Sequence, residues 1–250
     1  TQSLEQDLMF LGKLHPHTLV TLLNIAHIYH QVGNFTDAYK RFKEVHASMV
    51  IMYGTDSLES ASAMFNMGLM KYQLKQNDEA LDFYQQALRI QRDFYGNDEN
   101  QTVASSLNSI GLVLFNKGAH TLAKDCFYES LRIRKKLFGS DHREVAVLWY
   151  NLATFHLETG DAELGIRYYE ETLRIEREVL GTEHPDVTLT LQHLGLACQQ
   201  QGKLEKALVY FEEAHTLEKG KNEKNGEAIS KLLNLMGNIH LQRGHTGKMM

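Results

Sequence analysis

Two histidines spaced three residues apart are the first candidates for chemistry in this sequence. His27 and His30 lie about one helical turn apart, a spacing that can contribute two ligands to a metal ion. A zinc site needs at least one further protein ligand at a fixed spacing, and the sequence offers none nearby. We therefore expect both rings to stack on neighbours or to face water. We predict no metal site and no cofactor.

Other catalytic signatures are missing from the sequence. It has no P-loop, no paired-glycine dinucleotide fingerprint and no zinc-protease motif, and its Ser, His and Asp residues lack a nucleophile-elbow context. A short basic cluster could bind phosphate, but it is more typical of a solvated helix face; it comprises Arg132, Arg134, Lys135 and Lys136. We predict that the chain is not an enzyme.

Uncharged amides and aromatic residues recur at helical spacing and are the strongest candidates for a site. Asparagine is a poor helix former, so its return to one helix face suggests a use. An amide both donates and accepts hydrogen bonds, so a row of amides can bind the backbone of an extended peptide. Alternatively, these amides bridge neighbouring helices or only face water. The predicted peptide-binding residues are Asn24, His27, Gln31, Phe65, Asn66, Tyr72, Gln73, Asn108, Ser109, Phe115, Asn116, Tyr150, Asn151, Leu157, Gln192, His193, Gln200, Lys231 and Asn234.

An internal repeat must position these residues. A small residue returns at steps of 42, 43, 42, 42 and 42 residues, at Ala26, Gly68, Gly111, Ala153, Gly195 and Gly237. A turn position returns with the same steps, at Gly33, Lys75, Gly118, Gly160, Gly202 and Gly244. An aromatic residue follows in the same register, at Phe42, Tyr84, Phe127, Tyr169 and Phe211. Several series in one register establish a repeat architecture.

Each repeat reads as a pair of helices joined by a tight turn. In the clearest copy, Pro185 occupies a first helical position, where its missing N–H costs nothing. Apolar residues then recur at helical spacing until Gly202 ends the first helix. Gly195 lies in the middle of that helix and costs about 1 kcal/mol relative to alanine. This cost is tolerable if the second helix packs against the bare backbone there.

These repeats predict an all-α fold, an α-solenoid of stacked antiparallel helix pairs with about 12 helices. The expected first helices cover 17–32, 59–74, 102–117, 144–159, 186–201 and 228–243, and the second helices cover 35–52, 78–94, 121–137, 163–179 and 204–219. We expect one array over 1–250. Its full repeats are 15–54, 55–96, 97–139, 140–181 and 182–226, and the partial ones are 1–14 and 227–250. The partial repeats suggest a chain cut from a longer protein.

Composition restricts the setting of this array. The chain has two prolines and no apolar run long enough for a bilayer, and it begins without a signal-like segment, so we predict no membrane insertion. Cys126 and Cys198 fall in different repeats and are expected in the core as free thiols, which favours a cytoplasmic location. A formal net charge of −5 argues against a nucleic-acid partner.

The repeat resembles the tetratricopeptide repeat (TPR), and its long period resembles the kinesin light chain subfamily. Two inter-repeat segments have the subfamily's signature, Leu11-Gly12 with His15-Pro16 and Leu180-Gly181 with His184-Pro185. This resemblance implies a right-handed superhelix whose first helices line a concave groove. It also implies that Asn24, Asn66 and Asn151 match groove asparagines that hold cargo peptides.

The sequence thus predicts a non-catalytic scaffold that binds a peptide segment of a partner protein, extended or helical. Relatives that clamp a C-terminal carboxylate use basic groove residues six positions before the small residue. Here those positions are Val20, Ser62, Ser105, Val147, Leu189 and Lys231, so such a clamp is not expected. Two alternatives stay open: a docking or sensor region of a larger signalling enzyme or ATPase, and self-association through the ends of the array.

Overall fold

The structure is a computed structural model and describes residues 9, 11–12, 14–96, 99–221 and 226–246. All regular structure in this part of the chain is helical. The first helices of the repeats are α2 (Pro16–Gln31), α4 (Leu58–Gln73), α6 (Gln101–Asn116), α8 (Arg143–Glu158), α10 (Pro185–Gln200) and α12 (Gly226–Thr246). The second helices are α3 (Phe35–Tyr53), α5 (Asn77–Tyr95), α7 (His120–Phe138), α9 (Ala162–Leu180) and α11 (Leu204–Lys221).

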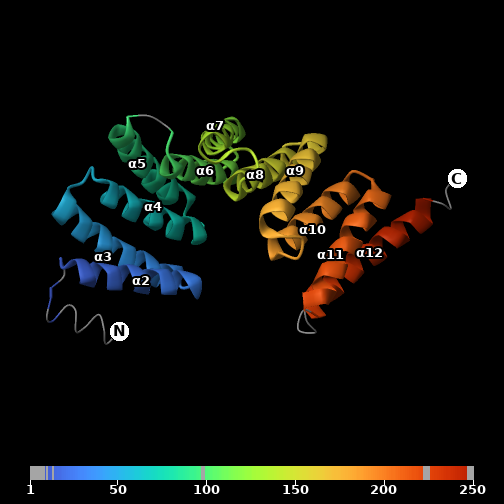
Figure 1. Cartoon of the computed structure of the whole chain (residues 1–250), viewed down its shortest axis with the longest axis horizontal. Helices are drawn as coiled ribbons and strands as arrows, with labels where there is room; N and C mark the ends of the chain where they lie inside the picture. Colours follow the sequence, from blue (N-terminus) through green and yellow to red (C-terminus); the bar gives the residue numbers. More distant parts are fainter. Residues whose placement is uncertain (1–8, 10, 13, 97–98, 222–225, 247–250) are drawn as a thin grey trace. The chain divides into compact units, whose positions relative to one another are not determined.

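The predicted helix pairs are confirmed, and the bounds of all ten helices in the five full pairs agree within two residues. The helix expected within 1–14 falls mostly outside the described residues. The chain forms two compact units, Thr1–Leu137 and Phe138–Met250. In the first unit α2, α3, α4, α5 and α6 pack in succession, and in the second unit α8 to α12 do the same (Figure 1). Each unit is therefore a stack of helix pairs, as in an α-solenoid. A single array over 1–250 stays a prediction.

Side-chain caps start the first helices of the five full repeats. The Nδ1 atoms of His15 and His184 accept hydrogen bonds from the backbone N–H groups of His17 and Asp186, both at 3.2 Å. Pro16 and Pro185 follow at the first helical positions. His142 caps α8 in the same way, without a proline. A cap satisfies a backbone donor that the helix itself cannot, and this fixes where each repeat begins.

Close packing within each helix pair explains the small residue at the centre of the first helix. A Cβ atom added at Gly195 would lie 2.5 Å from Cε1 of Phe211, and one added at Gly111 would lie 2.8 Å from Cε1 of Phe127. Both aromatic rings are fully buried. The expectation that a second helix packs on the bare glycine backbone is confirmed, and this contact sets how closely α10 approaches α11.

One interpretation of the basic cluster is wrong. Arg134 is 4% exposed and donates from a guanidinium nitrogen to Oγ of Ser105 at 3.3 Å, so it does not belong to a solvated face. Arg132 is exposed and paired with Glu129 on the preceding turn of α7, as expected of a surface residue. Arg134 differs because its position on α7 faces the start of α6.

Candidate functional site

The predicted peptide-binding residues all lie on first helices, and none of the nineteen is buried. Eleven of them belong to α2, α4 and α6 of the first unit, and eight belong to α8, α10 and α12 of the second unit. Core positions on the same helices are occupied by the apolar series instead. The helical phase predicted from sequence therefore separates accessible residues from core residues in both units.

A cavity of about 540 Å³ opens on the first unit among these helices. Phe65 and Asn66 of the predicted set line it, together with Ser62 and Ser105 from the position where carboxylate-clamping relatives carry basic residues. Its apolar lining includes Leu23, Val45, Met49 and Ala63. The volume lies within the range of small-molecule and side-chain pockets in proteins.

Sequence reasoning missed part of this cavity. Met49, Gln91 and Tyr95 reach it from the second helices α3 and α5, and Glu59 and Thr102 reach it from the starts of α4 and α6. The prediction assigned the site to first helices alone. The period locates equivalent residues, but it does not show how far the ends of α3 and α5 extend past the neighbouring first helix.

The amides of the predicted site divide into two groups. In the first group, Asn116 donates from Nδ2 to the Tyr72 hydroxyl at 3.0 Å. Ser109, a hydroxyl member of the predicted site, is hydrogen-bonded to Tyr84 in a similar way. Asn116 thus bridges neighbouring repeats, which is the alternative role considered for these amides. Within the described part of the chain, the side-chain amides of Asn24 and Asn66 bond to no other protein group. These two amides are available for a ligand.

Aromatic residues of the second unit form one packed cluster. The ring of Tyr150 meets those of Tyr169 and His193 edge-on, with centroid distances of 5.1 and 5.5 Å, and His193 stacks on Tyr169 at 5.7 Å. Burial lowers the pKa of His193, assisted by the charge of Lys231, and burial raises the pKa of Tyr150. The lowered pKa favours the neutral form of His193, and the three rings form an aromatic surface.

Leu157 of the predicted set also takes part in packing within the second unit. It is half-buried against the core of the second unit. A Cβ atom added at Gly165 of α9 would lie 2.7 Å from its Cγ. Its contact closes the α8–α9 hairpin near the turn.

The paired histidines contact aromatic rings. His27 meets Phe42 at 5.3 Å between centroids, and His30 meets Phe35 at 5.8 Å. The first contact is edge-on and the second is tilted, so both rings contact aromatic neighbours without parallel stacking. Among the described residues, no group of three His, Cys, Asp or Glu side chains is placed to hold a metal ion.

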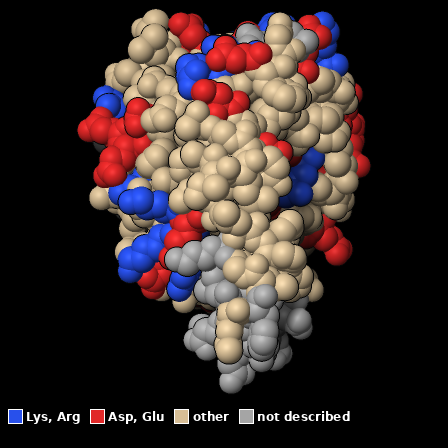
Figure 2. All heavy atoms as spheres, turned by 90° about the vertical axis from the view of Figure 1, so that its left-hand side faces the viewer, with Lys and Arg blue, Asp and Glu red and all other residues tan. Residues whose placement is uncertain are grey.

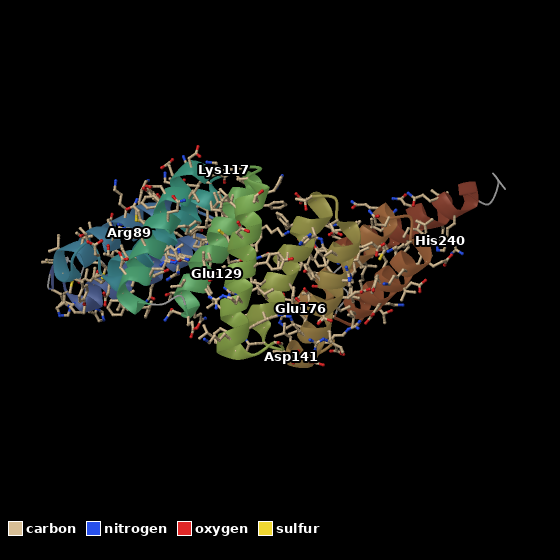
Figure 3. All side chains as sticks on the ribbon, turned by 90° about the horizontal axis from the view of Figure 1, so that it is seen from above. Arg89, Lys117, Glu129, Asp141, Glu176 and His240 are labelled. Carbon is tan, nitrogen blue, oxygen red and sulfur yellow. The ribbon has the colours of Figure 1, made fainter. Side chains whose placement is uncertain are left out.

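Charge is sparse on the first helices of the first unit. Helices α2 and α6 contain no Asp, Glu, Lys or Arg, and α4 contains only Glu59 and Lys71. Lys71 is buried and bonded to Glu79 and Gln76 at 2.6 and 2.9 Å, while Glu59 is exposed. The second helices carry the charges instead, among them Arg89 and Glu129 (Figure 3). Figure 2 shows one side of the first unit, with charged side chains toward its edges and a broad uncharged middle.

Comparison with protein families now decides the repeat type. A tetratricopeptide repeat model matches residues 2–93 and 144–219, and a second model of the same repeat matches residues 103–144. The chain belongs to the tetratricopeptide repeat family. No curated protein sequence matches this TPR chain.

Solved structures share the fold at low sequence identity. BtubC (BKLC) from P. vanneervenii is 18% identical with a TM-score of 0.73, over 89% of this chain and 88% of its own. A putative kinesin light chain repeat protein from Podosopora anserina is 19% identical with a TM-score of 0.68, over 82% and 96%. The Rap conjugation gene regulator of plasmid pLS20, in complex with the Phr* peptide, is 16% identical with a TM-score of 0.65, over 82% and 54%. The chain shares its fold with these TPR structures, among them BKLC and the putative kinesin light chain repeat protein.

No helix in the described part of the TPR chain combines the length and the apolar character needed to cross a membrane.

Proposed function

We propose that this TPR protein is a non-catalytic scaffold that binds a peptide segment of a partner protein on its first helices. The observation that carries the proposal is the pair of unbonded amides, Asn24 and Asn66, with Asn66 lining the cavity of the first unit. TPR folds are protein–protein interaction scaffolds, so a peptide is the ligand class that fits this surface best.

The chemistry of the amides suits an extended backbone. An asparagine side chain can accept from one peptide N–H group and donate to a peptide C=O group, and both bonds are independent of the bound sequence. Asn66 is half-buried beside Phe65, so its side chain loses less freedom on binding than a fully exposed amide would. The adjoining cavity can then accept a side chain of the peptide, and this contact gives selectivity.

One structural neighbour supports a peptide ligand. The Rap regulator was solved with a bound peptide, and this chain shares its fold over 82% of the present sequence. At 16% identity the likeness concerns the fold alone, so the choice of ligand rests on the residues described above.

The test is a titration with a fluorescent peptide obtained by display selection on this chain. We expect Asn66→Ala to weaken binding by about 5- to 30-fold, because each lost amide bond leaves a backbone group of the peptide without its partner. Asn24→Ala and Asn151→Ala test the other asparagines of the predicted site. Gln86→Ala is the matched control, since Gln86 lies on α5 and, among the described residues, bonds only to Asp82 of the same helix, at 2.8 Å. Equal affinity for the wild type and all three asparagine variants would refute the proposal.

Three further expectations stay predictions. They are a cytoplasmic location and the two alternatives named from the sequence, a docking or sensor region of a larger signalling enzyme or ATPase and self-association through the ends of the array. Light scattering over a concentration series tests self-association, because a dimer would double the mass found at low concentration.

A further inference from the structure

We propose that the cavity of the first unit selects a partner segment that inserts a large apolar side chain and carries a Lys or Arg next to it, which pairs with Glu59. This inference rests on the proposed function and specifies the chemistry of the peptide. The specificity depends on the residues that line this cavity.

The apolar half of the inference comes from the cavity lining. Leu23 of α2, Val45 and Met49 of α3, and Ala63 of α4 contribute apolar surface to a volume of about 540 Å³. Phe65 forms part of the wall, and its ring is held by Tyr84 at a centroid distance of 5.2 Å. An apolar side chain placed there would gain about 25 cal/mol for each Å² that it removes from water.

The charged half of the inference comes from Glu59, which lines the same cavity and is exposed. Neither Lys nor Arg lines the cavity. Lys71, the single cation of α4, is buried and paired with Glu79. Arg89 on the neighbouring helix α5 is paired with Asp56 at 2.7 Å and with Asp93 at 3.5 Å.

Glu59 therefore has no cationic partner among the described residues, and the cations Lys71 and Arg89 are paired with other carboxylates. On helices α2, α4 and α6 it is the one exposed formal charge in a wall of amides, serines and apolar groups. A basic residue of the partner would complement it, and an acidic residue would be repelled. Because Glu59 lies in the first turn of α4, the helix dipole offsets part of its charge, so the preference is expected to be modest.

The probes are short acetylated and amidated peptides of alanine and serine with a central phenylalanine. Lys, Gln or Glu is placed two residues before and after the phenylalanine, because side chains two apart face the same side of an extended chain. A fourth peptide keeps the lysines and replaces phenylalanine with alanine. Binding to the full 250-residue chain is followed by NMR titration, which detects millimolar dissociation constants.

We expect the Lys peptide to bind about 3- to 10-fold tighter than the Glu peptide, with the Gln peptide between them. Glu59→Gln should abolish this difference, and Glu59→Lys should reverse it. Glu144→Gln is the matched control, because Glu144 occupies the same repeat position at the start of α8 and should leave the difference unchanged. Ser62→Phe, which places a ring in the cavity from an exposed position, should weaken binding of all the phenylalanine peptides.

Equal affinity for the Lys and Glu peptides, retention of the Lys preference in Glu59→Gln, or equal affinity for the phenylalanine and alanine peptides would each overturn the inference. Absence of binding by all four peptides at millimolar concentration would overturn it as well. If a display-selected peptide depends on Asn66 but not on Glu59 or the cavity, the proposed function stands and only this inference fails.

Discussion

Glu176 is a carboxyl group held inside the second unit on α9 (Figure 3), and it makes the stability of that unit depend on pH. It is 9% exposed and accepts a hydrogen bond from Oγ1 of Thr190 at 2.8 Å. Burial raises its pKa from the ordinary value of 4.5 to about 7; the charge of Asp186 adds to this shift, while Thr190 and Arg143 oppose it. Between these two pH values the folded state keeps a proton that the unfolded state has lost. The contribution of Glu176 to the free energy of unfolding is therefore most favourable below about pH 4.5, and it decreases as the pH rises to about 7.

We predict that Glu176→Gln removes this dependence. The variant should match the wild type near pH 4 and exceed it by about 1–3 kcal/mol near pH 8, because glutamine carries no charge to bury. Gln91 already occupies this repeat position in the first unit and accepts from Oγ of Ser106 at 2.8 Å. Urea denaturation of both proteins across this pH range gives the comparison. Glu178→Gln is the control, since Glu178 is exposed and pairs with Arg174. A difference between wild type and Glu176→Gln that does not change with pH would contradict the assignment.

Lys75 is the one described residue other than glycine with a positive φ, at 61°. It holds the turn position that Gly33, Gly118 and Gly160 hold elsewhere, where φ lies between 76° and 96°. A residue with a Cβ atom is strained by about 1–2 kcal/mol in this conformation. Glycine avoids the strain, but its greater conformational freedom in the unfolded chain offsets part of the gain in stability. We predict that Lys75→Gly raises stability by about 0.5–1 kcal/mol and that Gly118→Lys lowers it. Thermal melts of the two variants decide this, and a less stable Lys75→Gly protein would contradict the prediction.

At the scale of elements, the spacing between paired helices depends on the glycine–aromatic contact. Gly195→Ala would place a methyl group 2.5 Å from the buried ring of Phe211, so α10 and α11 must shift apart. We expect a loss of about 1–3 kcal/mol. Gly237 occupies the same repeat position on α12, where a Cβ atom meets nothing within 4 Å. Gly237→Ala should therefore be neutral or stabilising by up to about 1 kcal/mol. Equal melting temperatures for the two variants would show that the contact does not set the spacing.

Much of this level of structure follows from sequence because it depends on local rules. Helix bounds, histidine caps, turn residues and the small–aromatic contact repeat in one register, so each copy supports the others. The contacts and burial of individual side chains do not follow from the sequence pattern. Asn116 bonds to Tyr72 of the preceding repeat, Arg134 is buried against Ser105, and Met49 reaches the cavity from a second helix. These outcomes depend on rotamers and on the small rotation between neighbouring repeats, and the period contains information on neither.

At the scale of the whole molecule, the charged residues are divided unevenly between the first and the second helices. Second helices carry most of the charges and pair them with one another, as with Arg89 and Asp93 on α5 or Arg132 and Glu129 on α7. First helices of the first unit are nearly uncharged and present amides and a cavity. Repeat proteins commonly bind ligands on such extended surfaces, because each repeat needs only its neighbours for stability. The account depends on the first helices being the binding surface.

Hydrogen–deuterium exchange of the chain with and without a saturating display-selected peptide tests that claim most directly, supported by NMR shift mapping of the side-chain amides. The account predicts protection and shift changes on α4 around Asn66 and on the adjoining parts of α2 and α6, with α5 unchanged on its charged face around Gln86. Changes confined to the second helices, with the Asn66 amide unaffected at saturation, would contradict it.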